Sequence, residues 1–325
     1  MNETPADRQR LREELFRETP LDWLERNGLG IAWSFAPERV ASMPALTWLW
    51  LKDVLARSNG LPDPESSLNA GGVVGICRDL SVPTLIEASK RGLYPHSHVG
   101  RPKWWSPEQR AILDLEEFHI GKQVRRTMRR GDYRVTFDQD FERVITACAG
   151  KRPGHWHLNW ITPKIMWSYA DLFDAGIAHS FEVWDREGEL VGGGYGIAVG
   201  SVYIGESLFS LRRDTSKIGV AMLVWHLAKW GYSFIDTKHM NPLMESFGFR
   251  AVPRAEFLAL NEEAMAKPGR IGRWHAEAGT EVVADWRPDH AVSAAPKAEA
   301  DHGGCQHRSS EPAIDTQVQR TGTGD

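Results

Sequence analysis

Cysteine is scarce in this chain of 325 residues, which has three: Cys77, Cys148 and Cys305. Three cysteines cannot build a disulfide framework, and no two of them have CxxC spacing, so we expect a reducing compartment. Long apolar runs are missing too. The start, MNETPADRQRLREEL, has no signal-peptide core, and no uncharged stretch approaches the roughly 20 residues of a membrane-spanning helix. These absences predict a cytoplasmic protein without a membrane partner.

Basic residues are not in excess either. The chain has 39 lysines and arginines against 43 acidic residues, a formal net charge of -4. A surface that is basic throughout, suited to nucleic acid, is thereby excluded, whereas a local patch is not. Six basic residues do lie close together in the sequence. They are Lys122, Arg125, Arg126, Arg129, Arg130 and Arg134.

This basic segment has the spacing of an amphipathic helix. Ile120, Val124 and Met128 would face the core, and the arginines would cover the opposite side. A concentrated positive face of this kind suits the phosphate backbone of a nucleic acid. An ordinary solvated helix face is the alternative, and the pattern alone does not decide between the two.

Apolar residues are plentiful, at 42% of the chain with fourteen tryptophans, which is enough for one large domain or two small ones. A helix is expected from Thr162-Pro163 to Gly176, since threonine is a good N-cap and proline suits the first turn. Alternating runs predict an antiparallel meander, followed by shorter elements. This order predicts an α+β fold with a mixed, largely antiparallel sheet. The expected strands are 177–184, 189–199, 201–208 and 233–236, and further helices are expected at 215–230, after 241 and from 253.

The two flanks differ from this body. Residues 1–66 begin with a charged, helix-prone stretch and continue with tryptophan and leucine, so a helical extension that packs on the body is expected. From residue 276 onward aromatic residues nearly vanish, which predicts a disordered tail over 276–325. Cys305 lies in this tail between His302 and His307, but a metal site there is not favoured.

Two motifs in the body have both a structural and a functional interpretation. Gly192-Gly193-Gly194 lies inside a strand pattern, so it is neither a dinucleotide-binding nor a P-loop motif, and it marks a bulge or the close approach of a ligand. Trp104-Trp105 could stack a base or line an apolar pocket. Core packing is the favoured alternative for the tryptophans when they are taken alone.

Charged residues also gather near the ends of two predicted strands. Glu206, Ser207 and Ser210 belong to one strand, and Asp236 and Lys238 to the next. Ends of neighbouring strands in an open sheet converge on a crevice where ligands tend to bind. The two carboxylates could hold a cation or orient an amine there, and structural salt bridges are the alternative.

Taken together and in order, nine blocks of the sequence resemble the bacterial leucyl/phenylalanyl-tRNA–protein transferases over roughly residues 70 to 260. The blocks are long, collinear and specific. They are GLYPHS (92–97), WWSPEQRAIL (104–113), RRGDYRVTFDQDFERVITACA (129–149), NWITP (159–163), HSFEVW (179–184), ELVGGGYGIAVG (189–200), GESLFSLRRDTSK (205–217), FID (234–236) and VPRAEFL (252–258).

The resemblance implies an aminoacyltransferase. Members of this family move leucine or phenylalanine from charged tRNA to the N-terminus of an acceptor protein, usually at Arg or Lys, and so mark it for degradation through the N-degron pathway. Methionine is a further candidate for the transferred residue. The implied fold is a GNAT-like catalytic domain, here 109–275, preceded by a smaller α/β domain at 67–108. The family resemblance also implies a monomer that needs no metal, coenzyme A or other cofactor.

It further implies roles for individual residues. Asp236 matches the family's catalytic aspartate, Glu206 its acceptor-pocket glutamate, and Trp160 the tryptophan near the 3′-terminal adenosine. Because an aminoacyl ester is already activated, the enzyme mainly has to position the α-amine, which Asp236 would orient by accepting a hydrogen bond. The basic helix, with Lys122, Arg125, Arg126, Arg129 and Arg130, would hold the tRNA acceptor stem. The implied aminoacyl and adenosine pocket comprises Tyr94, His96, Trp104, Trp105, Ser207, Leu208, Phe209 and Ser210.

The sequence departs from the family pattern at three places. Cys77-Arg78 replace a glycine pair, and His96 replaces a tryptophan of the GxFPW motif. Lys238 replaces the glutamine two residues after the catalytic aspartate, which puts a cation at the catalytic site. These departures also allow a non-catalytic descendant that binds charged tRNA or N-degrons. A cell-wall peptide-bridge aminoacyltransferase is a third hypothesis, against which the GESLFS and NWITP blocks count.

Lys238 is the departure with the largest expected consequence. Facing an acceptor Arg or Lys about 5 Å away, its charge would cost about 3 kcal/mol at an effective dielectric constant of 20. Alternatively it pairs with Asp236 or Glu206 and cancels the acidity that attracts a basic N-terminus. In both cases we expect weaker selectivity for basic acceptors and a shift toward neutral or acidic ones.

Overall fold

The computed structural model describes residues 5–34, 60–67, 71–96, 100–151 and 159–288, and a few isolated positions between 44 and 55. The predicted metal-ligand candidates of the tail, His302, Cys305 and His307, lie outside these residues. Across the described part of the chain, no helix combines the length and the apolar character needed to cross a membrane.

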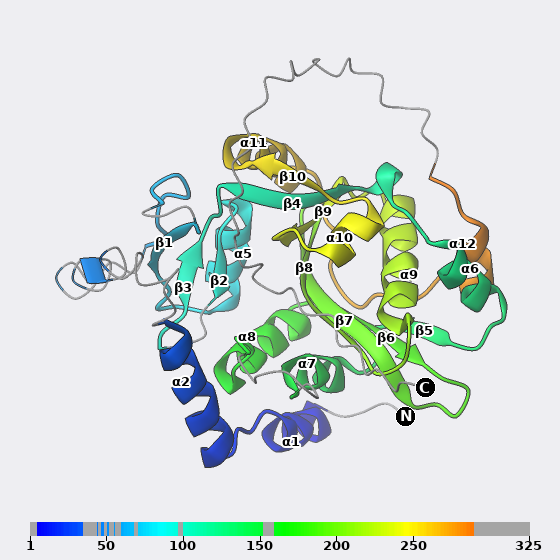
Figure 1. The fold of residues 1–325 in the computed structure, drawn as a ribbon, viewed down its shortest axis with the longest axis horizontal. Coiled ribbons are helices and arrows are strands. Elements are labelled where there is room, and N and C mark those ends of the chain that lie inside the picture. Colours follow the sequence, from blue (N-terminus) through cyan, green and yellow to red (C-terminus); the bar gives the residue numbers. More distant parts are fainter. Residues whose placement is uncertain are drawn as a thin grey trace.

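The described residues form two sheets (Figure 1). The smaller sheet has the strand order β1-β3-β2, with antiparallel pairing throughout. Helix α5 packs beside it, and Leu85 of α5, Leu93 and Trp104 of β3 are buried together in one core. The elements are β1 (Val73–Ile76), α5 (Val82–Lys90), β2 (Tyr94–His96) and β3 (Lys103–Trp105).

The larger sheet has seven strands in the order β10-β4-β9-β8-β7-β6-β5. Its pairs are antiparallel except for β8 and β9, which run parallel. The α+β fold with a mixed, largely antiparallel sheet is therefore confirmed. The strands are β4 (Gln109–Asp114), β5 (Arg134–Phe137), β6 (Ala178–Trp184), β7 (Leu190–Val199), β8 (Val202–Ser210), β9 (Phe234–Lys238) and β10 (Arg250–Pro253).

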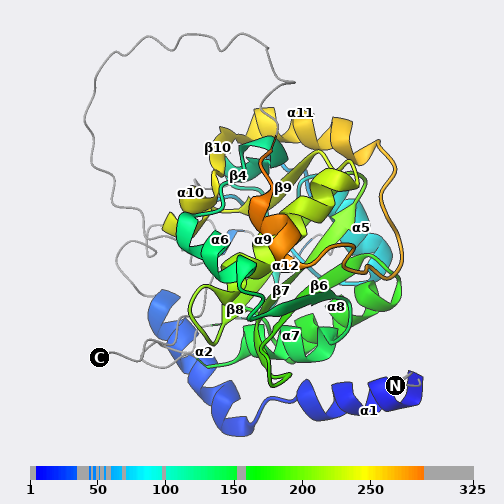
Figure 2. The ribbon, with the colours of Figure 1, turned by 90° about the vertical axis from the view of Figure 1, so that its right-hand side faces the viewer.

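Helices cover both faces of this sheet (Figures 1 and 2). Helices α7 and α8 share one hydrophobic core with the smaller sheet, whereas α6, α9 and α12 share a second core on the opposite face. The bounds are η1 (Leu115–Glu117), α6 (Lys122–Arg129), α7 (Phe141–Ala149), α8 (Pro163–Asp174), α9 (Thr215–Lys229), α10 (Pro242–Phe247), α11 (Arg254–Met265) and α12 (Thr280–Asp285).

The local signals in the sequence set the helix ends. The hydroxyl of Thr162 accepts the backbone N–H of Ile165 at the start of α8, and Gly176 follows that helix with a φ of 72°. Asn241 accepts two N–H groups at the start of α10 in the same way. Such caps satisfy backbone donors that have no partner inside the helix.

The N-terminal extension contains two helices, α1 (Pro5–Leu15) and α2 (Pro20–Ser34), and it docks on the body through α1. The buried guanidinium of Arg12 lies 2.9 Å from the Glu142 carboxylate of α7 and 2.6 Å from Asp174 at the end of α8. Phe16 packs edge-on against Trp167 with ring centroids 5.5 Å apart. These contacts agree with an extension that packs on the rest of the chain.

The tail begins later than the sequence analysis placed it. Residues 280–285 form α12, and Val283 and Ala284 are fully buried against α6 and α9. The side chain of Arg125 also donates hydrogen bonds to the carbonyls of Ala284 and Trp286. The boundary at 276 was wrong because a few apolar residues suffice to hold this segment on the body, where Val283 and Ala284 are fully buried.

Glu182, on β6, makes stability depend on pH. Its fully buried carboxylate accepts hydrogen bonds from the hydroxyls of Thr136 and Ser180, but burial raises its pKa to about 7. Because this lies above the unfolded value, the folded state holds a proton that the unfolded state releases between about pH 4.5 and 7. The stability contribution of Glu182 is therefore fully present below pH 4.5 and is lost as pH rises to 7, by about 3 kcal/mol.

We therefore expect the free energy of unfolding of the wild type, minus that of Glu182→Gln, to fall by about 2 to 3 kcal/mol between pH 5 and pH 8. Urea unfolding of both proteins at several pH values measures this difference. A difference that does not change with pH would contradict the assignment.

Candidate functional site

Four charged side chains meet where β4, β9 and β8 lie side by side. They are Arg110, Asp236, Lys238 and Glu206, and all four are buried. The register brings them together, because β4 and β9 pair at Ala111 and Lys238, and β9 and β8 pair at Asp236 and Ile204. Asp236, Lys238 and Glu206 were predicted from the sequence, whereas Arg110 was missed.

Arg110 holds Asp236 in a two-point ion pair. Its Nε and Nη2 atoms lie 2.8 Å and 2.7 Å from the two carboxylate oxygens, and Nη1 donates to the carbonyl of Gly92. The guanidinium is sandwiched between the rings of Tyr94 and Phe257, at 4.9 Å and 4.3 Å. Burial alone would raise the pKa of Asp236, but Arg110 reverses this and lowers it below its usual value. The aspartate is thus held as an anion.

Lys238 has an unusual backbone conformation, with a φ of 69°. Its N–H donates to Oδ1 of Asp236 at 2.8 Å, which fixes this turn at the end of β9. Its Nζ atom lies 2.6 Å from the Glu206 carboxylate and donates to the carbonyl of Gly205 at 2.9 Å. Of the two expectations for Lys238, pairing with a carboxylate is confirmed, and the partner of its ammonium is Glu206.

A β-bulge places Glu206. Tyr195 of β7 pairs with Ser207, but the next residue, Gly196, pairs with Gly205, so Glu206 is the extra residue of β8. Burial raises the pKa of Glu206, and the opposing effects of Lys238 and of a hydrogen bond with Tyr169 do not cancel that rise. The buried carboxylate of Glu206 is therefore bound by two side chains, the ammonium of Lys238 and the hydroxyl of Tyr169.

A row of aromatic rings leads to Glu206 through Tyr169. The Trp105 indole donates to the carbonyl of His96 at 2.9 Å, and the His96 ring lies 5.5 Å from the ring of Trp160. Trp160 in turn meets Tyr169, the partner of Glu206, at 6.2 Å. His96, Trp105 and Trp160 are half-buried. Trp104 is 2% exposed and packs in the core, as its structural interpretation held.

Tyr94 and His239 form a second polar contact beside the four charges. The Tyr94 hydroxyl and Nε2 of His239 lie 2.8 Å apart, and the Lys238 ammonium is 5.5 Å from the Tyr94 ring. Burial, with nearby Arg110 and Lys238, lowers the pKa of His239 to about 4, so its ring is neutral near pH 7. The sequence analysis missed His239, although it directly follows the singled-out Lys238.

Several predicted pocket residues lie elsewhere. Ser207 is next to Glu206 on β8, but Leu208 packs against the core on the α9 face. Phe209 is fully buried, and the Ser210 hydroxyl donates to the carbonyl of Arg212 in the turn before α9. Together with Trp104, four of the eight expected pocket residues are therefore part of the core or of a turn: Trp104, Leu208, Phe209 and Ser210.

The triple glycine serves close packing. A Cβ atom on Gly193 would lie 2.6 Å from the carbonyl oxygen of Phe181 and 2.9 Å from the ring of Phe209. On Gly194 it would lie 2.8 Å from the Phe181 ring and from the carbonyl oxygen of Ser207. The neighbours of these glycines are the chain's own side chains and backbone, which favours the structural interpretation over ligand approach.

The basic helix is α6, and one of its arginines points inward. Arg125 is 8% exposed and donates to the carbonyls of Ile120, Ala284 and Trp286, so its predicted place on the solvent face was wrong. The carbonyls of Ala284 and Trp286 lie at the C-terminal end of α12, and that of Ile120 lies just before α6, so one guanidinium joins the two segments. The remaining four basic residues of the set, Lys122, Arg126, Arg129 and Arg130, are exposed.

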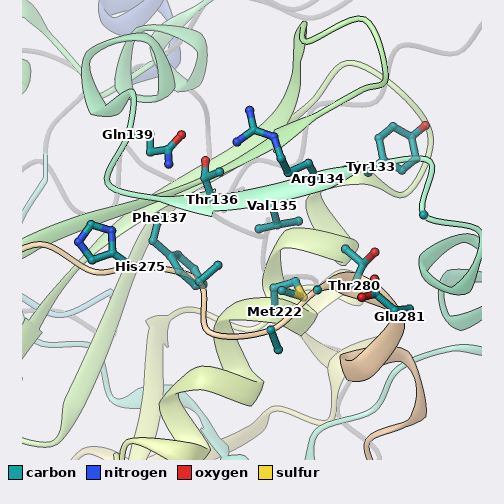
Figure 3. A pocket seen from close by; sticks show the side chains of 14 residues that line it. Tyr133, Arg134, Val135, Thr136, Phe137, Gln139, Met222, His275, Thr280 and Glu281 are labelled. Carbon is teal, nitrogen blue, oxygen red and sulfur yellow. The ribbon is translucent and has the colours of Figure 1, made fainter. Parts of the chain in front are cut away.

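A cavity of about 480 Å³ lies away from the four charges, between the outer edge of β5 and residues 275–281 (Figure 3). Val135 and Phe137 of β5 line it together with Met222 of α9. Within the described residues, no three His, Cys, Asp or Glu side chains are grouped so as to hold a metal ion.

Comparison with known proteins agrees with the resemblance. Residues 112–262 match the family model of leucyl/phenylalanyl-tRNA protein transferase. The chain is 37% identical to the leucyl/phenylalanyl-tRNA–protein transferase of Alkalilimnicola ehrlichii over 249 residues, which is 76% of this chain and 96% of that protein. It is 42% identical to the one of Stutzerimonas stutzeri over 65% of this chain and 92% of that protein.

Among solved structures, L-PGS from Bacillus licheniformis is similar over 45% of each chain, at 15% identity and a TM-score of 0.28. A likeness at this level supports no statement about fold or function.

Proposed function

This chain belongs to the leucyl/phenylalanyl-tRNA protein transferase family and is an aminoacyl-tRNA–protein transferase, and we propose that it moves leucine or phenylalanine from charged tRNA to the N-terminal α-amine of acceptor proteins. Such a product marks the acceptor for degradation. We place the reaction in the cytoplasm, where charged tRNA is made. Methionine is a further candidate for the transferred residue.

The reaction needs positioning more than activation. The neutral α-amine attacks the ester carbonyl carbon, an amide bond forms, and the bond to the ribose oxygen breaks. The amine nitrogen loses a proton and the ribose oxygen gains one. Since an α-amine has a pKa of about 8, a useful fraction is neutral near pH 7 without a strong base. Holding the amine against the carbonyl carbon therefore supplies most of the rate.

The aromatic row is the proposed donor site. Trp105, His96 and Trp160 offer ring faces to the terminal adenosine and the aminoacyl group, and the row ends at Tyr169, next to Glu206. Aromatic faces stack bases with little sequence preference. An apolar side-chain pocket selects by size, at about 1–3 kcal/mol for each methylene. The exposed cations of α6 would bind the acceptor-stem phosphates.

Asp236 is the proposed amine-orienting group. Its Oδ1 accepts N–H groups from Arg110 and Lys238, whereas Oδ2 accepts one from Arg110, which leaves a lone pair for the α-amine. The carboxylate is fully buried, so the side chains around it must shift to admit the amine. We also propose a GNAT-like fold, on the strength of the parallel β8–β9 pair in an otherwise antiparallel sheet.

The observation that carries the proposal is the convergence of the aromatic row and the four buried charges on one place. Purified protein, Leu-tRNA or Phe-tRNA radiolabelled in the amino acid, and acceptor peptides test it. We expect label in peptides with a free N-terminus and none in N-acetylated peptides. Absence of transfer to every acceptor, with tRNA binding intact, would favour the non-catalytic descendant.

A further inference from the structure

Lys238 places a positive charge beside the buried carboxylate of Glu206. Its ammonium lies 2.6 Å from the Glu206 carboxylate and 2.9 Å from the carbonyl oxygen of Gly205. We propose that Lys238 permanently occupies the acidic subsite formed by Glu206, and that the enzyme therefore prefers acceptors whose N-terminal side chain is uncharged. This inference rests on the proposed function and on the acceptor-pocket role of Glu206 that the family resemblance implies.

The lysine is anchored at both ends. Its backbone N–H is bonded to Asp236, whose carboxylate is itself held at two points by Arg110. Its side chain is buried, with 8% exposure, and Glu206 has 3%. A basic acceptor side chain would have to displace an ammonium that belongs to the protein and cannot diffuse away. The subsite is thus filled from within.

The local charge balance distinguishes neutral from acidic acceptors. Arg110 compensates Asp236, and Lys238 compensates Glu206, so the four buried charges sum to zero. A basic side chain meets the Lys238 ammonium together with the Glu206 carboxylate that neutralises it, so it gains no net attraction, and burying its own charge is unfavourable. An acidic side chain gains no unpaired cation, because Glu206 already neutralises Lys238. Uncharged side chains avoid both effects.

The walls around this pair are also apolar. Tyr169 and Tyr195 are buried with their rings 5.5 Å apart, and Trp160 packs on Tyr169. Burying an acceptor charge against such rings has a desolvation cost that no free counter-charge offsets. The surroundings of the pair therefore favour the same class of acceptor as its charge balance.

Peptides that differ only in their first residue test the inference. We expect Leu transfer to Ala-starting peptides with a kcat/KM about 10- to 100-fold higher than to Arg-starting or Asp-starting ones, because either charge would be buried without a free counter-charge. Lys238→Gln should raise the Arg-to-Ala ratio at least about 10-fold. Lys238→Asn is a second variant, because asparagine tolerates a positive φ better than other non-glycine residues. The double variant Lys238→Gln with Glu206→Gln should lose this rise in the Arg-to-Ala ratio, because the carboxylate that attracts the basic side chain is gone.

The outcomes separate this inference from the proposed function. A wild-type preference for Arg-starting peptides, unchanged in both Lys238 variants, would overturn the inference and leave the transferase activity standing. No transfer to any peptide would overturn the proposed function instead. In that case, equilibrium binding of fluorescent Ala- and Arg-starting peptides to wild type and Lys238→Gln still decides the subsite. Equal binding ratios in the two proteins would then overturn the inference as well.

Discussion

Arg110→Met is expected to destabilise the protein by about 3 to 5 kcal/mol and to leave no measurable transfer. The substitution removes the sole partner of Oδ2 of Asp236 among the described contacts and strands a carboxylate with no exposed surface. Breaking a buried ion pair from one side costs this much because the remaining charge stays buried without compensation. Urea unfolding followed by circular dichroism measures the loss, and the peptide assay measures the transfer.

Two further variants make this result interpretable. Arg110→Met combined with Asp236→Leu removes both charges, so most of the stability should return while transfer stays absent. Arg250→Met is the surface control, since Arg250 pairs with Asp114 and Glu256 but is 46% exposed, and it should cost at most about 1 kcal/mol. If Arg110→Met and Arg250→Met lower the free energy of unfolding by the same amount, the buried pair of Arg110 and Asp236 does not stabilise the site.

The sequence predicts the elements of the body because their signals are local. The cap at Thr162, the glycine at position 176 and the alternation over 177–208 depend on neighbours a few residues away, and α8, β6, β7 and β8 form within a few residues of the expected bounds. The predicted end of the third strand of the meander was less accurate, since β8 continues to Ser210 and not only to residue 208. Local chemistry therefore predicts where elements begin and end better than what each of them contacts.

The contacts of the site could be predicted only in part, because they depend on long-range pairing. Arg110 is 126 residues from Asp236, and nothing near it in the sequence points to that partner. A signal existed, however, since an arginine directly before Ala-Ile-Leu in a strand is a candidate for a buried charge. Arg125 shows the opposite error, because it was predicted to be exposed and is buried. Its partners, the carbonyls of Ala284 and Trp286, lie in a segment that was predicted to be disordered.

The partner of Lys238 shows the same limit at short range. Spacing alone allowed pairing with Asp236 on the same strand, β9, or with Glu206 on the neighbouring strand, β8. Backbone geometry decides between them: the positive φ at Lys238 gives its N–H to Asp236 and turns its ammonium toward Glu206. Lysine rarely adopts a positive φ, so the sequence does not indicate this backbone conformation at position 238.

Asp236→Asn is expected to lower the rate of transfer at least about 100-fold at saturating Leu-tRNA. The amide keeps the shape but loses the negative charge that stabilises the amine nitrogen as it becomes positive in the transition state. With its oxygen facing the Lys238 N–H, the new NH₂ group would also meet the donating Nη2 of Arg110. Single-turnover assays with folded protein measure the rate, and filter binding measures affinity for Leu-tRNA.

Binding of Leu-tRNA should change less than about 3-fold in Asp236→Asn, because Asp236 contacts Arg110 and Lys238 and not the aromatic row. Asp114→Asn is the matched control, since this half-exposed aspartate pairs with Arg250 at the surface and should transfer at the wild-type rate. Since Arg110 lowers the pKa of Asp236, its charge persists above pH 5. The rate should then rise with pH only as the acceptor amine loses its proton, near pH 8. A full rate in Asp236→Asn, or a rise that tracks a group near pH 5, would show that Asp236 does not orient the amine.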